Sequence, residues 1–114
     1  MPEKADLTPV PAVKRKRNPK APRQQLPLLD PVKRTTSCEE VALGFDKEQA
    51  WVEALRCLNC RDPKCVDACP LHIDIKSVIA RMVDGDFGGA FETISEYTPF
   101  PGICGRVCQH ELFC

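Results

Sequence analysis

Four cysteines within thirteen residues constrain this chain more than any other feature of its sequence. They follow the order C-x2-C-x4-C-x3-C, at Cys57, Cys60, Cys65 and Cys69, and Pro70 comes directly after the last of them. Thiols at this density indicate a metal site. The first two spacings allow neighbouring sulfurs to turn onto one cubane iron–sulfur cluster. The helical step from Cys65 to Cys69 ends at Pro70, so the fourth sulfur can serve a second cluster.

Zinc, disulfides and a catalytic thiol are the alternatives to iron–sulfur clusters. Zinc sites usually have two C-x2-4-C pairs separated by a longer loop, and the x4 and x3 spacings depart from that pattern. The N-terminus has no apolar region typical of a secretion signal, so we expect a cytoplasmic, reducing setting in which disulfides are disfavoured. No cysteine has a histidine and an orienting carboxylate at a spacing typical of a nucleophile, and His72 and His110 are interpreted as surface or loop residues.

The end of the chain supplies three more thiols, at Cys104, Cys108 and Cys114. Seven clustered cysteines are nearly enough for two cubane clusters, which need eight ligands between them. The sequence stops on a cysteine, where a metal-ligand motif would be expected to continue, and we therefore interpret it as a piece of a longer protein. Cys38 stands apart from the others, and we expect it to be a small buried hydrophobic residue.

Residues 1–36 differ in composition from the remainder. They carry seven of the eleven prolines, and nine Lys or Arg against three Asp or Glu. Such a segment has too little apolar surface to offset its ordering entropy, so we predict an extended or disordered basic, Pro-rich arm before a domain over residues 37–114. The run Lys14–Arg17 is interpreted as a solvated basic stretch, and no nucleic-acid partner is expected. No apolar run approaches the roughly 18 residues that span a membrane.

The hydrophobic pattern of residues 37–114 is helical, without the alternation typical of strands. Three helices are predicted: 46–58, started by a capping box of Asp46 and Gln49; 74–83, stopped by Gly85; and 86–97, ended before Pro99. The expected buried faces are Ala50, Trp51, Ala54, Leu55 and Leu58, then Ile75, Val78, Ile79 and Met82, then Phe87, Ala90, Phe91 and Ile94. The predicted fold class is all-α, a small helical domain with irregular cysteine-bearing metal loops.

Four stretches carry a more specific signal: Arg34-Thr-Thr-Ser-Cys-Glu-Glu-Val-Ala-Leu-Gly-Phe, Arg56-Cys-Leu-Asn-Cys, Cys69-Pro-Leu-His-Ile-Asp-Ile and Ile103-Cys-Gly-Arg-Val-Cys. Together they resemble the N-terminal iron–sulfur domain of the glutamate synthase small subunit family. That family also includes related subunits of bifurcating ferredoxin:NADP oxidoreductases and the N-terminal domain of dihydropyrimidine dehydrogenase. The resemblance covers about Pro27 to Cys114 and leaves the basic arm outside it.

The resemblance implies two [4Fe-4S] clusters in an α-helical ferredoxin-like domain. Carried over by motif, one cluster would be held by Cys57, Cys60 and Cys65 with a cysteine from beyond the end of the chain. The second would be held by Cys69, Cys108 and Cys114, its last ligand also coming from downstream. The counterpart of Cys104 is not a usual ligand. Two positions depart from the family pattern: Cys38 stands where an aromatic is more common, and Gln109 replaces a proline.

The function implied by the resemblance is electron relay. In the family, the iron–sulfur domain precedes an FAD- and NADPH-binding module and passes electrons to a partner such as the glutamate synthase large subunit. That module, with its G-x-G-x-x-G fingerprint, is absent from this sequence, so no catalytic residue is assigned and no activity is expected of the domain alone. The alternative is a metal-free or zinc-binding interaction module that mediates subunit docking.

Overall fold

Helices form the regular structure of residues 16–114, the part of the chain that the computed structural model describes, apart from one isolated antiparallel bridge between Leu28 and Ala42. The start of the predicted arm, with Lys14 and Arg15 of its basic run, lies outside these residues. The helices are α1 Pro31–Arg34, α2 Lys47–Ala54, α3 Lys64–Ala68, α4 Ile75–Val83, α5 Phe87–Ser95, α6 Pro101–Val107 and α7 His110–Phe113. The prediction of a small, mostly helical domain is confirmed.

Helix α2 begins at the predicted capping box. An Asp46 carboxylate oxygen accepts a hydrogen bond from the Gln49 N–H at 2.8 Å, and the Gln49 side chain accepts one from the Asp46 N–H at 3.1 Å. The helix ends at Ala54, four residues earlier than predicted. Leu58 therefore does not continue its buried face, and it is 73% exposed. The expectation of a buried Leu58 is wrong because the chain has already turned toward the cysteine loop.

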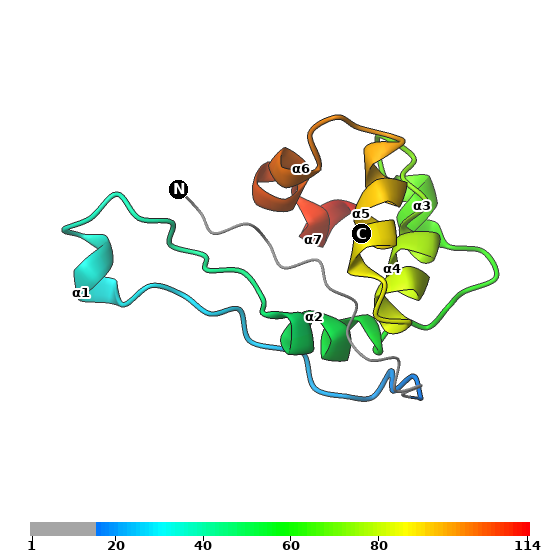
Figure 1. Cartoon of the computed structure of the whole chain (residues 1–114), viewed down its shortest axis with the longest axis horizontal. Helices are drawn as coiled ribbons and strands as arrows, with labels where there is room; N and C mark the ends of the chain where they lie inside the picture. Colours follow the sequence, from blue (N-terminus) through cyan, green and yellow to red (C-terminus); the bar gives the residue numbers. More distant parts are fainter. Residues whose placement is uncertain (1–15) are drawn as a thin grey trace.

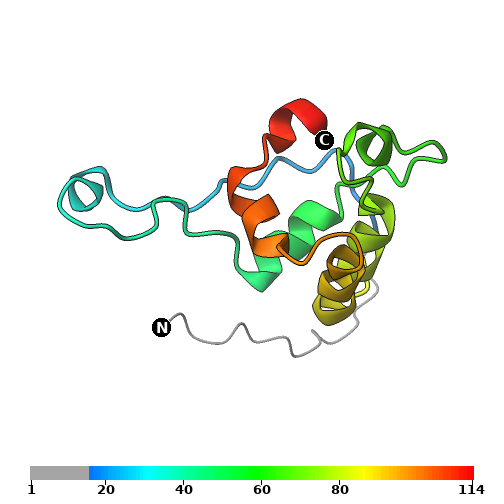
Figure 2. The ribbon, with the colours of Figure 1, turned by 90° about the horizontal axis from the view of Figure 1, so that it is seen from above.

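Helices α4 and α5 form an antiparallel pair, and they lie side by side in both views of the ribbon (Figures 1 and 2). Each begins at an aspartate: Asp74 accepts a hydrogen bond from the Ser77 N–H at 3.0 Å, and Asp86 accepts one from the Gly89 N–H at 2.8 Å. Between them the chain reverses at Gly85, whose φ of 80° lies in the left-handed region that glycine adopts without strain. These two helices and the Gly85 stop agree with the predictions.

The face that α5 buries is formed by small residues, Gly89, Ala90 and Thr93. Phe91 follows Ala90 and is therefore turned about 100° away around the helix. Its side chain is 51% exposed, which contradicts the expectation that Phe91 is buried.

The core lies where α2 meets the α4–α5 pair. Trp51 is the largest fully buried side chain among the described residues, with 2% of its surface exposed. Its indole N–H donates a hydrogen bond of 2.8 Å to the carbonyl oxygen of Val83. A second cluster joins Ile73 to Val78 and Ala90 on the facing helices. The loop with Cys57 and Cys60 follows α2, and the segment with Cys65 and Cys69 leads into α4. Both cysteine-bearing segments are therefore connected directly to helices of this core.

Residues 16–30 run in an extended path along α2 before the chain leaves the helical body. Figure 1 shows α1 at the tip of a long excursion far from the other helices. The two sides of this excursion are joined by hydrogen bonds from the Leu29 N–H to the Val41 carbonyl at 2.8 Å and from the Leu43 N–H to the Pro27 carbonyl at 2.9 Å. Leu29 is buried. Much of the described part of the arm is thus extended, and α1 adds a helical turn inside it.

Cys38 lies on the returning side of this excursion and is exposed. No helix packs over that part of the chain in Figure 1. The expectation that Cys38 is a buried hydrophobic residue is therefore wrong. Among residues 16–114, no helix has the length and apolar character needed to cross a bilayer.

Candidate metal centre

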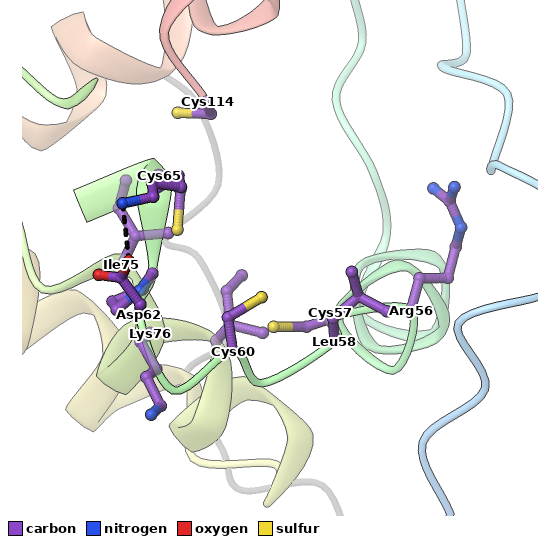
Figure 3. Close-up of a pocket in the computed structure, with 12 residues that line it drawn as sticks. Arg56, Cys57, Leu58, Cys60, Asp62, Cys65, Ile75, Lys76 and Cys114 are labelled. Carbon is purple, nitrogen blue, oxygen red and sulfur yellow. Dashed lines mark ion pairs between the residues drawn. The ribbon is translucent and has the colours of Figure 1, made fainter. Parts of the chain in front are cut away.

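Four of the predicted ligand thiols line a single cavity of about 380 Å³: those of Cys57, Cys60, Cys65 and Cys114. Figure 3 shows the sulfurs of Cys57 and Cys60 pointing toward one another, while Cys65 comes from α3 and Cys114 from the end of α7. The three thiols that are related by the x2 and x4 spacings therefore line the same cavity. The structure also brings to them a thiol that the resemblance assigns to the second cluster.

A tight loop turns the Cys57 and Cys60 side chains onto this cavity. Asn59 adopts a φ of 53°, in the left-handed region that asparagine tolerates better than most residues. Its backbone N–H lies 3.4 Å from the Cys57 sulfur, to which it donates a hydrogen bond. Hydrogen bonds to ligand sulfurs are one of the means by which proteins tune iron–sulfur clusters. The sequence reasoning missed Asn59, although asparagine in a two-residue gap is a signal for such a turn.

The second predicted group comprises Cys69 and Cys108 together with Cys114. Cys69 ends α3 and packs against the core cluster of Ile73, Val78 and Ala90. Cys108 ends α6, with its N–H donating to the carbonyl of Cys104 at 3.3 Å. Both thiols are half-buried.

Cys114 lies near thiols of both groups. The pKa of its thiol is raised, first by partial burial and then by the neighbouring thiols of Cys108, Cys69 and Cys65. This set of neighbours includes both partners that the resemblance gives it, Cys69 and Cys108. It also includes Cys65, with which it shares the cavity.

The remaining candidate side chains stand apart from the cavity. Cys104 is half-buried on α6, one turn before Cys108, and does not line it. His72 and His110 are both exposed, as predicted. The His110 Nδ1 lies 3.2 Å from the Cys108 carbonyl oxygen.

The walls of the cavity combine apolar side chains with charged ones. Arg56, Lys64 and Lys76 contribute positive side chains, and Leu58, Ile75 and Ile79 contribute hydrocarbon. Lys64 forms an ion pair with Asp62 at 2.7 Å, drawn as the dashed line in Figure 3, and this contact is the first cause of its raised pKa. Asp62 adds a carboxylate to the lining, and the Arg56 guanidinium is ion-paired with Glu53 and points away from the cysteine sulfurs in Figure 3, so the walls carry charge of both signs.

The donor set fits a cluster. Within residues 16–114, no group of three or more His, Cys, Asp or Glu side chains is arranged to hold a single metal ion. Each ligand of a cubane cluster binds a different iron, so its thiolates stand further apart than four ligands of one ion. A cavity lined by four thiols, with no histidine among its lining residues, matches the ligand chemistry of a [4Fe-4S] site.

Arg17 contacts the same loop from the N-terminal segment. One guanidinium nitrogen donates a hydrogen bond of 3.2 Å to the carbonyl oxygen of Cys57. The sequence reasoning placed Arg17 in a solvated basic run and missed this contact. No local signal could have revealed it, because the two residues are 40 positions apart.

Comparison with known proteins gives a consistent result. Residues 34–114 match the family described as dihydropyrimidine dehydrogenase domain II, 4Fe-4S cluster. The NAD-dependent dihydropyrimidine dehydrogenase subunit PreT of Salmonella typhimurium is 40% identical over 76 residues, which are 67% of this chain and 18% of the relative. The putative oxidoreductase AegA of Escherichia coli is 37% identical over 82 residues, 71% of this chain and 12% of the relative. The chain spans less than a fifth of the length of these relatives.

Proposed function

Since the chain belongs to the dihydropyrimidine dehydrogenase domain II family of 4Fe-4S domains, we propose that it relays electrons between a flavin- and nicotinamide-binding module and a partner subunit. Membership makes it an iron–sulfur electron-transfer domain of an oxidoreductase family. The relay between two particular modules goes further than that and is our proposal. The observation that carries it is the convergence of four thiols on one cavity.

Two ligand sets follow from the family motif. Cys57, Cys60 and Cys65 are proposed to hold the first [4Fe-4S] cluster, and Cys69, Cys108 and Cys114 the second, each set completed by a further ligand. The shared cavity supports the first set. The proximity of Cys69 and Cys108 to the Cys114 thiol supports the second. Because Cys114 also lines the first cavity, the two clusters are proposed to lie close together, in an α-helical ferredoxin-like arrangement.

The protein side chains determine how well such a centre holds and transfers an electron. When bound, a [4Fe-4S] cluster supplies a one-electron couple that accepts an electron from a reduced flavin and returns it to an acceptor. The Asn59 N–H donates to the Cys57 sulfur and so stabilises negative charge at the first site, and Lys76 lines the same cavity. Ile75 and Ile79 add hydrocarbon to the wall of this cavity. Apolar surroundings strengthen the interaction between the Asn59 N–H and the Cys57 sulfur.

The substrate of the whole protein is proposed from its relatives. The name of PreT points to NAD as the electron source and to dihydropyrimidine chemistry at a partner. The resemblance to the glutamate synthase small subunit points instead to FAD, NADPH and a large subunit that forms glutamate. We favour NAD and dihydropyrimidine chemistry, because this alternative agrees with both the family match and the names of the relatives. Either kind of oxidoreductase would operate in the reducing cytoplasm.

Anaerobic reconstitution of the full-length protein with iron and sulfide tests the relay. We expect visible charge-transfer absorption, iron and acid-labile sulfide in near-equal amounts, and an EPR signal after reduction. Zinc without sulfide would instead favour the alternative docking module, and the absence of an EPR signal in a protein that contains iron would contradict electron relay. Reduction of the reconstituted centre by NADH or by NADPH then identifies the electron source.

A further inference from the structure

The segment before the family-matched residues 34–114 is attached to the end of α2 by hydrogen bonds. The Asn18 N–H donates to the carbonyl of Leu55 at 2.8 Å, and the Arg56 guanidinium donates to the carbonyl of Ala21 at 3.1 Å. The Gln24 N–H adds a bond of 3.0 Å to the Glu53 carboxylate. These hydrogen bonds hold the end of α2 in place, immediately before the Cys57–Cys60 loop.

Arg17 extends this attachment to the cysteine loop itself. Its guanidinium donates to the backbone carbonyl of Cys57, and both residues are half-buried. Cys57 is also the residue whose sulfur accepts the Asn59 N–H. Cys57 is therefore held at its carbonyl oxygen by Arg17 and at its sulfur by the N–H of Asn59.

We propose that Arg17 is a positioning residue for the first cluster, holding the Cys57–Cys60 loop in place and raising the reduction potential of that cluster. The inference rests on the proposed function. Reduction adds one electron, here from a chemical reductant or a reduced flavin, and so adds negative charge to the site. A guanidinium remains protonated at all working pH values, and its charge stabilises the reduced form more than the oxidised one. Partial burial limits screening by salt.

This role belongs to the N-terminal segment and not to the family-matched domain. The cations that line the cavity, Arg56, Lys64 and Lys76, lie within residues 34–114, whereas Arg17 contacts the backbone of Cys57 from outside the lining. Arg17 lies outside that range, so the segment adds a charge that the matched domain lacks when taken alone.

The test compares three variants of the full-length, reconstituted protein. Arg17→Gln removes the charge, Arg17→Lys keeps it but loses the planar guanidinium, and Arg23→Gln is a matched control on the same segment. Arg23 is exposed and lines a different cavity. EPR-monitored redox titration gives the potential of each cluster, and iron release to a chelator gives cluster stability. We expect Arg17→Gln to shift the first cluster to a more negative potential and to release its iron several-fold faster. Arg17→Lys should be intermediate, and Arg23→Gln should match the wild type.

The second cluster serves as an internal control. An equal shift of both reduction potentials in Arg17→Gln would indicate a general loosening of the domain and would overturn the proposal. Faster iron release with unchanged potentials would overturn it as well. If the wild-type protein binds no cluster, the proposed function fails and the tuning of a potential fails with it. The positioning role is then judged from amide hydrogen exchange at residues 57–60 of the metal-free protein: faster exchange in Arg17→Gln supports it, and unchanged exchange overturns it.

Discussion

The indole N–H of Trp51 donates a hydrogen bond of 2.8 Å to the carbonyl oxygen of Val83, the last residue of α4. The last carbonyls of a helix have no partner within the helix, so this bond satisfies a group that α4 leaves open. It connects α2, which leads into the Cys57 loop, with the helix that carries Ile75 and Ile79 at the cavity. This hydrogen bond in the core thus joins the helix that precedes the cysteine loop to the helix that contributes to the cavity wall.

Trp51→Phe should destabilise the chain by about 2–3 kcal/mol. The change leaves a gap beside the benzyl ring and deprives the Val83 carbonyl of its partner, and each effect costs roughly 1–3 kcal/mol at a buried site. Urea unfolding followed by circular dichroism measures the difference. Tyr97→Phe, at an exposed aromatic, is the control and should stay within about 0.5 kcal/mol of the wild type. Equal stability of Trp51→Phe and wild type would show that the bond contributes nothing.

Two adjacent glycines of α5 should respond to alanine in opposite directions. A methyl group at Gly89 would overlap the side chains of Asp86 and Arg81, and Asp86 is the residue that caps α5. Gly89→Ala should therefore cost about 1–2 kcal/mol through the displaced cap. A methyl group at Gly88 would meet no atom nearer than the Asp86 carboxylate at 3.9 Å, apart from the adjacent residues and the backbone of the helix, so Gly88→Ala should stabilise the helix by about 0.5 kcal/mol. Thermal unfolding of the two variants, compared with the wild type, decides the signs.

Asp74 should make the stability of the chain depend on pH in the acid range. The Ser77 hydroxyl and N–H both donate to its carboxylate, at 2.6 Å and 3.0 Å, and they lower its pKa below the usual value of 3.8. A lowered pKa in the folded state gives stability that is fully present above pH 3.8 and is lost as the pH falls through the lower, folded value.

Asp74→Ala should accordingly lose about 1 kcal/mol at neutral pH, the usual value of an N-cap, and the deficit should shrink below pH 3.8. Asp84→Ala, at the opposite end of α4, removes a negative charge from a helix C-terminus and should be neutral or slightly stabilising. Urea unfolding at a series of pH values measures both variants. A deficit that is constant with pH would contradict the role of the ionised carboxylate.

Cys60→Ala should remove one cluster from the reconstituted protein, lowering iron and sulfide to about half if two cubane clusters are bound. It should also loosen the loop, because ligation and folding are coupled. Cys38→Ala is the matched control: its thiol is exposed and does not line the cavity, so metal content should be unchanged. Loss of iron from Cys38→Ala would mean that the proposed ligand sets are wrong.

Features set by nearby residues were predictable from the sequence. The capping box of Asp46 and Gln49 depends on residues three positions apart, and the stop at Gly85 depends on one residue that adopts a positive φ without strain. The three longer helices were therefore expected close to their observed places. The short helices α6 and α7 were not, since a helix of one or two turns is stabilised mainly by packing and leaves little periodic signal.

Features set by distant contacts were not predictable. Cys38 and Phe91 are apolar enough to be expected inside, and only the path of the chain over residues 16–114 shows that their side chains are exposed. Arg17 was indistinguishable from its basic neighbours until its contact with Cys57 was visible. The grouping of Cys57, Cys60 and Cys65 followed from spacing and recurs as a shared cavity, whereas the approach of Cys114 to that cavity depends on how the last helices fold back.

Helix α3 carries Cys65 near its start and Cys69 directly after its end, so one short element presents a thiol to each proposed cluster. The four-residue interval amounts to a rise of about 6 Å along a helix and a little more than one turn. Inserting or deleting a single residue here would rotate one thiol by about 100° relative to the other, and no change of side chain could restore the alignment. The two proposed clusters would therefore constrain the length of α3 more tightly than the identity of its other side chains.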